Sequence, residues 1–207
     1  MRTIIYVDGF NLYYGALKNI SFKLLDLPLL FETILHPCHQ IHKVRYFTAK
    51  IAAQPDNPLK PRRQEMYLRA LRVYRPNVEV HLGHFLAHEI RMPLAYPTKR
   101  QKMARVIRTE EKGSDVNLAS YLLTDIWRGI CDCAVVVTND SDIAGALDLA
   151  KRYNQVRIGL ITPAKRHPSW QLKKYADFVK RIRTNALKQS QLPNPIPNTT
   201  IYKPERW

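Results

Sequence analysis

The sequence has few cysteines and no long apolar run, and these absences exclude two classes of protein. It holds only Cys38, Cys131 and Cys133, an odd number without a repeated spacing, which argues against a disulfide framework. No run approaches the roughly 18 apolar residues that a membrane span requires. The first apolar stretch contains Asp8 and Asn11 and lacks a signal-peptide cleavage site. We therefore expect a cytoplasmic protein that has no membrane partner.

Acidic residues are also scarce, because 17 Asp and Glu stand against 33 Lys and Arg and leave a formal net charge of +16. A field of this sign attracts polyanions, of which nucleic acid is the usual one. The alternative, a basic surface that only keeps the protein in solution, stays open. A hydrophobic content of 45% and a length of 207 residues fit one domain with a substantial core and a tail.

Apolar runs alternate with helical patterns along the chain, which predicts βαβ units and a mainly parallel sheet. The predicted strands are 3–7, 44–49, 78–86, 134–138 and 156–161, and three of them are continuous apolar runs typical of buried strands. The predicted helices are 11–18, the part of 22–36 that follows Pro28, 62–75, 114–128 and 141–153. Residues 54–61 predict a loop, 87–111 an excursion such as a hairpin, and 168–183 a further amphipathic segment.

The composition changes near the end of the chain. Three prolines in residues 192–198 prevent a helix or a central strand there. Ile201, Tyr202 and Trp207 favour a terminal arm that docks on a neighbouring surface, which makes a homodimer possible. We assign residues 1–185 to one domain and residues 186–207 to a Pro-rich C-terminal arm.

Four aspartates stand where predicted strands end or helices begin. Asp8 follows the first strand, Asp140 and Asp142 follow the fourth, and Asp115 opens the helix before it. Ligands of open α/β sheets bind beyond the carboxyl ends of the strands, so we expect these acids to gather there. Clustered carboxylates need a cation to stay ionised, and oxygen ligands suit Mg²⁺ or Mn²⁺.

Neighbouring polar residues extend this prediction to a reaction. A metal-bound water can attack a phosphodiester, and Asn11 could orient a carboxylate or that water. Thr138 and Ser141 lie at a strand-to-helix turn that could hold a carboxylate or a phosphate. Taken singly, Asp142 could be a first-turn acid and Asp115 a plain N-cap. The coincidence of several such junctions favours a joint catalytic site of Asp8, Asp115, Asp140, Asp142 and Asn11.

Basic residues form predicted phosphate-binding patches around these acids. Arg62 and Arg63 open a helix, Lys99 and Arg100 lie in the excursion, and Lys112 is three residues from Asp115. Aromatic side chains could stack on bases, as in single-strand binders. They are Tyr46, Tyr67 and Tyr96. A charge run is more often only a solvated face, but acids within a basic surround suit a metal nuclease that binds RNA.

Three motifs together resemble the NYN domains, a PIN-like nuclease group that includes the LabA-like bacterial proteins. They span residues 6–13 (YVDGFNLY), 112–119 (KGSDVNLA) and 137–143 (VTNDSDI), and the resemblance covers about residues 1–182. It implies a Rossmann-like, three-layer α/β/α sandwich with a mainly parallel sheet. It also implies a metal-dependent ribonuclease whose core acids are Asp8, Asp115 and Asp140. Asn139 and Tyr121 stand where many members have Gly and some have an acid.

Two further functions remain open from the residues. One is a non-catalytic RNA- or protein-binding module that keeps the acids as a structural cation site. The other is a different phosphoryl-transfer enzyme, which is disfavoured because Gly9 and Phe10 follow Asp8 where a second acid would be needed. The chain also lacks the glycine-rich phosphate loop of nucleotide-binding enzymes.

Overall fold

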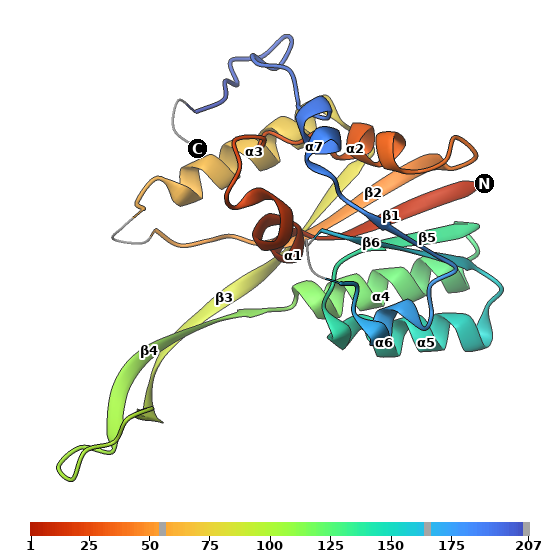
Figure 1. Ribbon diagram of the computed structural model, residues 1–207. Helices are drawn as coiled ribbons and strands as arrows, with labels where there is room; N and C mark the ends of the chain where they lie inside the picture. Colours follow the sequence, from red (N-terminus) through yellow and green to blue (C-terminus); the bar gives the residue numbers. More distant parts are fainter. Residues whose placement is uncertain (54–56, 164–166, 205–207) are drawn as a thin grey trace.

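A seven-stranded sheet forms the middle layer of the computed structural model, which describes residues 1–53, 57–163 and 167–204 (Figure 1). The strands are β1 (Arg2–Asp8), β2 (Gln40–Ala49), β3 (Val78–Pro93), β4 (Met103–Lys112), β5 (Cys133–Val137), β6 (Arg157–Thr162) and β7 (Phe178–Arg181). Their spatial order is β4-β3-β2-β1-β5-β6-β7. Every neighbouring pair is parallel except β3 and β4, which form an antiparallel hairpin.

The order of the parallel strands determines where a site can form. Without β4, the parallel strands lie in the order 3-2-1-4-5-6 of a doubly wound sheet when they are numbered along the chain. The direction of winding reverses between β1 and β5, and the two loops that leave these strands diverge there. The predicted α/β class with a mainly parallel, Rossmann-like sheet is therefore confirmed.

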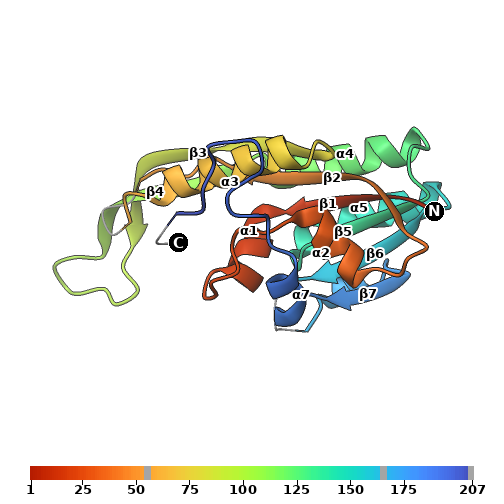
Figure 2. The same cartoon turned by 90° about the horizontal axis from the view of Figure 1, so that it is seen from above.

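Helices cover both faces of the sheet (Figures 1 and 2). One layer consists of α1 (Gly9–Leu12), the π-helical turn η1 (Tyr13–Leu17), α2 (Leu27–Ile34), α3 (Lys60–Tyr74) and α7 (Thr184–Gln189). The other consists of α4 (Ser114–Trp127), the 3₁₀ turn η2 (Ser141–Ile143), α5 (Ala144–Tyr153) and α6 (Trp170–Lys173). No helix among the described residues is long and apolar enough to cross a membrane.

Alternation along the central strands builds two cores. In β1, Ile5 and Val7 pack into the layer of α2 and α3, whereas Ile4 and Tyr6 pack into the layer of α4 and α5. Successive side chains of a strand point to opposite faces, so a strand covered on both faces is apolar throughout. This is the physical reason for the continuous apolar runs of β1, β5 and β6.

Most predicted elements are confirmed, and two segments differ. The excursion is the β3–β4 hairpin, because β3 continues to Pro93. The segment 168–183 contains one helical turn and then β7, a short edge strand whose alternation is too brief to be recognised. Residues 54–56 of the predicted loop lie outside the described residues, and α3 already begins at Lys60.

The C-terminal segment docks on the layer of α2 and α3. Leu192, Ile196 and Ile201 are buried within the same core as Leu187 of α7. Leu192 also donates its backbone N–H to Leu24 at 2.7 Å. The separate 186–207 arm remains a predicted division of the chain.

A buried ion pair fixes α4 against β2. The Arg45 guanidinium donates to both Asp125 carboxylate oxygens, at 2.7 and 2.9 Å, and Tyr6 donates its hydroxyl to Asp125 at 2.9 Å. The side chains of the pair are only 8% and 3% exposed. The Tyr121 ring of α4 lies 4.6 Å from the same guanidinium. The register of α4, and with it the position of Asp115, depends on these contacts.

We expect Asp125→Ala to lower the free energy of unfolding by about 3–5 kcal/mol, because it leaves the Arg45 charge buried without its partner. Asp132→Ala is the matched control, since Asp132 pairs with Arg2 on the surface with side chains 45% and 56% exposed. The control should cost less than about 1 kcal/mol. Urea unfolding measures both, and equal losses would contradict this account.

Candidate functional site

The carboxylates gather in a hollow at the reversal point between β1 and β5. The hollow has a volume of ≈ 350 Å³ and lies at the carboxyl ends of the parallel strands. Its lining residues are Asp8, Phe10, Asn11, Tyr14, Phe85, Glu111, Ser114, Asp115 and Asp140. The structure therefore brings together four of the five predicted catalytic residues.

Asp8 is held by hydrogen bonds from both halves of the sheet. Its carboxylate accepts the backbone N–H of Asn11 at 2.8 Å and so caps α1. Its other oxygen accepts the Thr138 hydroxyl at 2.9 Å. Asn11 in turn accepts the backbone N–H of Asn139 at 3.0 Å. These bonds join the end of β1 to the end of β5, so the side chain that is only 6% exposed is fixed in place.

The turn after β5 places Asp140 in the hollow and Asp142 outside it. Asp140 donates its backbone N–H to the Thr138 hydroxyl at 3.1 Å, and its carboxylate accepts the backbone N–H of Asp142 at 3.1 Å. Asp140 thereby caps η2, which begins at Ser141. Asp142 is exposed and acts on the site only through its charge.

Asp115 enters the hollow from the first turn of α4. Gly113 precedes it with a φ of 99°, a left-handed conformation that favours glycine and turns the chain from β4 into α4. Glu111 accepts the backbone N–H of Ser114 at 3.0 Å and its hydroxyl at 2.7 Å. This end of the hairpin therefore adds a carboxylate that the motifs did not indicate.

Burial and mutual repulsion favour the protonated forms of these acids. The pKa of Asp115 is raised to about 6, mainly by burial and further by the charges of Asp8, Asp140, Glu111 and Asp142. Burial also raises the pKa of Asp8, although the hydrogen bonds from Asn11 and Thr138 oppose that rise. A carboxylate that titrates near neutral pH can accept or return a proton during a reaction.

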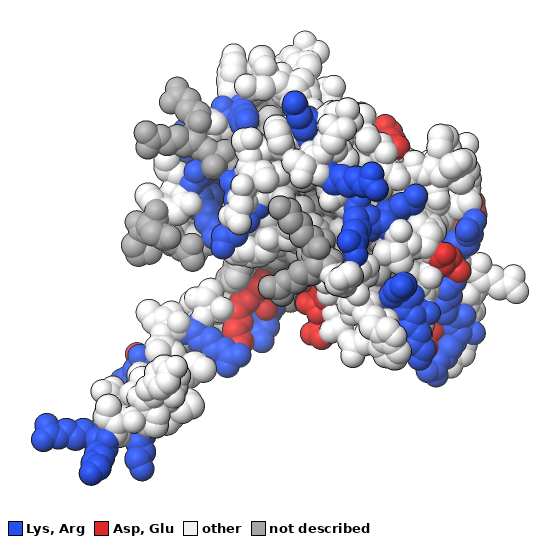
Figure 3. All heavy atoms as spheres, viewed as in Figure 1, with Lys and Arg blue, Asp and Glu red and all other residues white. Residues whose placement is uncertain are grey.

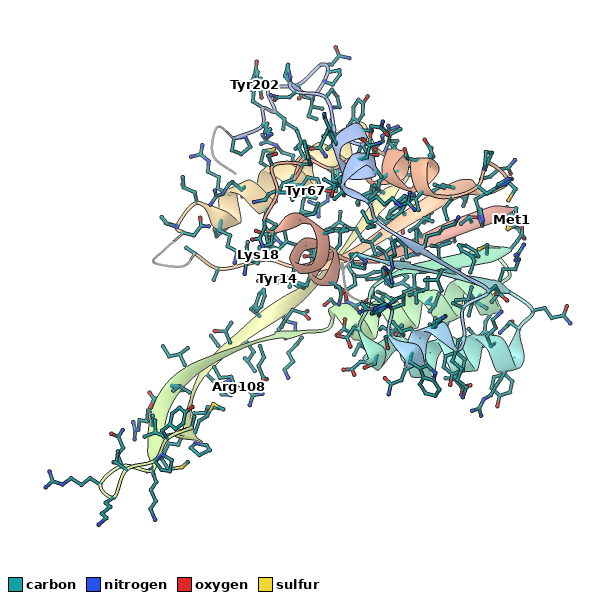
Figure 4. The ribbon with its side chains drawn as sticks, viewed as in Figure 1. Met1, Tyr14, Lys18, Tyr67, Arg108 and Tyr202 are labelled. Atoms are coloured by element: carbon teal, nitrogen blue, oxygen red, sulfur yellow. The ribbon has the colours of Figure 1, made fainter. Side chains whose placement is uncertain are left out.

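A second cavity adjoins the acidic hollow and shares Phe10 and Tyr14 with it. It has a volume of ≈ 330 Å³ and lies between α1, η1 and α3. Figure 4 shows Tyr14, Lys18 and Tyr67 around α1. Its aromatic walls are Phe10, Tyr13, Tyr14, Tyr46 and Tyr67. Gly9 keeps this region open, because a Cβ there would lie 2.8 Å from the Tyr46 ring.

Cations line the same cavity. They are Lys18, Lys23, Lys60 and Arg63. The pKa of Lys23 is lowered by burial and by the charge of Arg63, so the two cations disfavour each other. The ammonium of Lys18 lies 5.4 Å from the Tyr14 ring centre, at the boundary with the acidic hollow. The cavity therefore presents aromatic faces beside positive charges, which suits a planar organic anion.

The predicted phosphate-binding residues do not form one surface. Arg63 lines the aromatic cavity, whereas Arg62 faces a groove between α3 and the C-terminal segment. Lys112 pairs with Glu110 at 2.9 Å rather than with Asp115. Lys99 and Arg100 lie in the turn of the β3–β4 hairpin, far along the chain from the hollow. Among the residues predicted to bind RNA, Thr138 and Ser141 lie at the acidic turn.

The sequence reasoning missed Glu111 and most of the aromatic cavity. Glu111 stands three residues before Ser114, a spacing that could have indicated a reversed cap on the α4 start. The adjacent Tyr13 and Tyr14 were a visible signal, but the cavity forms only when the π-helical turn η1 brings them toward α3.

Comparisons with known proteins bear on the fold and on the family. No family model matches the chain. A crystal structure of a protein of unknown function from Vibrio parahaemolyticus superposes with a TM-score of 0.58, at 16% identity over 89% of this chain and 94% of that one. This similarity shows the shared fold alone.

A curated relative from Pseudomonas putida is named 6-hydroxy-3-succinoylpyridine 3-monooxygenase HspA. It is 35% identical over 237 aligned positions, which cover 100% of this chain and 75% of the relative. The chain belongs to the family of this monooxygenase. The relationship spans the acidic hollow and the aromatic cavity alike.

This finding corrects the functional prediction. The expected ribonuclease activity, and the description of the protein as a metal-dependent nuclease or hydrolase, are wrong, because the relative is named an oxidoreductase. The alternative of a non-catalytic module with a structural cation site falls with them. The motif residues are acids that can bind metal or transfer protons, so the motifs could not separate these chemistries.

The expected Mg²⁺ or Mn²⁺ cofactor is corrected as well. The relative's name indicates oxygen chemistry rather than phosphate hydrolysis. Within residues 1–53, 57–163 and 167–204, no group of three or more His, Cys, Asp or Glu side chains has a geometry that could hold a metal ion. The hydrogen bonds that orient Asp8 toward Asn11 and Thr138 occupy oxygens that a metal would need.

We expect Asp115→Asn to stabilise the protein at pH 8 by about 1 kcal/mol, a figure reduced because the side chain is partly exposed. The raised pKa means that the native state favours the protonated acid, so this stability is present below about pH 4 and is lost as the pH rises through about 6. The melting temperature should rise by about 2–4 °C at pH 8 and stay unchanged at pH 3.5.

Asp148→Asn is the control for this measurement. Asp148 lies on α5 and pairs with Arg152 on the surface, so its loss should leave the melting temperature at pH 8 unchanged or slightly lower. A fall in the melting temperature of Asp115→Asn at pH 8 would show that the charged form is favoured in the fold.

Proposed function

We propose that this protein is an oxidoreductase that inserts one oxygen atom into the ring of a small hydroxylated aromatic acid. The observation that carries the proposal is the aromatic, cationic cavity that opens beside a carboxylate with a raised pKa. Membership of the HspA family supports it independently, because the printed name of that relative describes a monooxygenase acting on a succinoyl-substituted hydroxypyridine.

The substrate would lie in the cavity between α1, η1 and α3. A planar ring would stack against Tyr13, Tyr14 or Tyr46, and offset or edge contacts between aromatic rings are favourable by about 0.5–1.5 kcal/mol. A carboxylate on its side chain would relieve the repulsion between Lys23 and Arg63. Because Phe10 and Tyr14 border both spaces, the ring hydroxyl would be directed toward the acidic hollow.

The acids would then act on protons. Asp115 in its ionised form would take the proton of the ring hydroxyl, and the resulting oxyanion would make the ring more electron-rich toward an oxygen electrophile. One atom of dioxygen would form the new carbon–oxygen bond and the other would leave as water. The balance requires two electrons from a donor and two protons, one of which Asp115 can return. Asp8 and Asp140 would keep the pKa of Asp115 high.

A flavin is one of the groups that support oxygen chemistry of this kind, and its fit can be judged from the residues present. The first turn of a doubly wound fold normally offers backbone N–H groups and glycines to a pyrophosphate. Here Asp8, Asp140 and Glu111 occupy that edge, and their charges would repel a phosphate. This edge does not suit a flavin or nicotinamide dinucleotide, so no step of the proposal passes through one.

We also propose that the scaffold is the PIN-like form of the fold on which the NYN domains are built. The support is that all three motifs meet at one edge of the sheet, where Asp8, Asp115 and Asp140 line one hollow. In this proposal Asn11 and Thr138 orient Asp8, and Asp142 contributes charge. The scaffold then serves proton transfer in an oxidoreductase. RNA binding through Arg62, Arg63, Lys99, Arg100 and Lys112 stays a prediction.

We expect Lys18→Met to weaken the binding of 6-hydroxy-3-succinoylpyridine about tenfold, or about 1.4 kcal/mol, because it removes a cation at the mouth of the cavity. The binding of 6-hydroxypyridine, which lacks the acid chain, should change less than twofold. Isothermal titration calorimetry of the full chain measures both. Lys188→Met, on the exposed surface of α7, is the control; equal weakening of both ligands would contradict a carboxylate contact.

We expect the rate of oxygen-dependent ring hydroxylation to rise with pH through about 6, because Asp115 must be ionised to accept the proton. Asp115→Asn should lower kcat by about 10²- to 10⁴-fold and remove this rising limb. The assay follows oxygen uptake and product by chromatography, with a panel of two-electron donors. Asp148→Asn should keep the profile. A rising limb that survives in Asp115→Asn would assign the base elsewhere.

A further inference from the structure

The outer part of the β3–β4 hairpin, residues 84–112, is a ribbon that no other element supports. β2 pairs with β3 only as far as Gly83. From His84–Lys112 to Pro93–Met103, β3 pairs with β4 alone, and the ribbon projects from the body (Figure 1). We call this segment the arm. An isolated two-stranded hairpin is at best marginally stable in water, so an arm of this length needs a surface to cover it.

Apolar side chains along the arm are exposed to solvent. Ile107 is 77% exposed and Leu86 is 48% exposed. Further apolar side chains of the arm are exposed in the same way. They are Met92, Tyr96, Met103 and Val106. Apolar side chains repeated along both strands of a projecting ribbon are typical of an interaction surface rather than of a solvated loop.

The charges of the arm are divided between its two ends. Between Glu89 and Glu110 the chain has six cations and no acid, and three of the cations lie in the turn: Lys99, Arg100 and Lys102. Arg105 pairs with Glu89 at 3.0 Å, and Arg108 pairs with Glu110. The three cations of the turn form no ion pair with any residue that the structure describes. Figure 3 shows Lys and Arg gathered at the free end of the arm.

The other end of the arm is acidic. Glu110 and Glu111 end β4 beside the hollow that holds Asp8, Asp115 and Asp140. Figure 3 shows Asp and Glu where the arm meets the body. The molecule therefore presents a basic tip and an acidic base at opposite ends of one ribbon. Two such ribbons placed head to tail are complementary in charge at both ends.

We propose that the arm is a dimerisation arm, and that its occupant is the arm and acidic base of a second copy of this chain. A two-fold axis across the arm brings each basic tip to the acidic base of the other copy, so that one contact is made twice. The second copy thereby supplies the cations that compensate the clustered carboxylates, and its tip covers the acidic hollow. This inference concerns assembly and does not depend on the proposed reaction.

The dimensions of the arm permit this arrangement. Ten paired residues at about 3.4 Å each make a ladder about 34 Å long. The tip of a second arm laid antiparallel to the first therefore reaches the point where the first arm joins the body. The net charges of the two chains repel each other, but at physiological salt this repulsion is screened beyond about 8 Å. Local contacts between the tip and the base then decide the association.

The first measurement is light scattering after size-exclusion chromatography of the full chain at several concentrations. The expected mass is twice 24.1 kDa. The tip variant Lys99→Glu/Arg100→Glu/Lys102→Glu should weaken the dimer at least tenfold, because like charges then meet at both ends. A matched control with the same charge change, Arg128→Glu/Lys173→Glu/Lys188→Glu, alters exposed cations outside the arm and should leave the dimer unchanged.

A charge swap separates loss of the contact from loss of folding. The base variant Glu110→Lys/Asp142→Lys should also be monomeric alone. Mixing it with the tip variant restores opposite charges at both contacts, so a heterodimer of the two variants should form when neither variant self-associates. Circular dichroism of each variant checks that the fold is kept.

Three results would overturn the proposal. A wild-type chain that remains monomeric at all concentrations would do so, as would a dimer that the tip variant does not weaken. The third is a monomer whose tip cations bind a single-stranded RNA, with binding lost in the tip variant and kept in the control. That result would assign the arm to nucleic acid rather than to a second copy.

Discussion

The hydrogen bonds that hold Asp8 at the reversal point of the sheet are the constraint on which the site depends. The carboxylate accepts from Asn11 on one side and from Thr138 on the other, and so joins the ends of β1 and β5. Without this junction the loops that leave the two strands would be free to separate, since they wind to opposite layers. The same bonds keep a buried carboxylate oriented and let it raise the pKa of Asp115 nearby.

The structure separates two tasks between neighbouring spaces. The hollow at the strand ends concentrates carboxylates, and the cavity between α1, η1 and α3 concentrates aromatic rings and cations. Phe10 and Tyr14 belong to both, so a ligand bound in one space is within reach of the other. A carboxylate cluster alone allows both metal binding and proton transfer. The neighbouring cavity and the family relationship favour proton transfer on an organic acid.

Much of the fold could be predicted from the sequence because burial on both faces leaves a strong local signal. β1, β5 and β6 are continuous apolar runs, and α4 has regular helical spacing. β7 has four residues at the sheet edge and carries no such signal. The extension of β3 could not be read either, because its outer residues pair only with β4 and alternate without a buried face. Charge composition indicated a polyanion, but it did not show that the cations divide between the arm, α3 and the cavity.

The sequence by itself determined the doubly wound class of the sheet, the two-faced burial of its strands and the identity of the acids at its carboxyl edge. These properties depend on local periodicity and on where polar residues interrupt apolar runs. The tertiary structure alone decided that Glu111 joins the acids, that Asp142 stays outside them, and that tyrosines from α1, η1, β2 and α3 surround one cavity. Those arrangements depend on contacts between residues far apart in the chain, which no local pattern records.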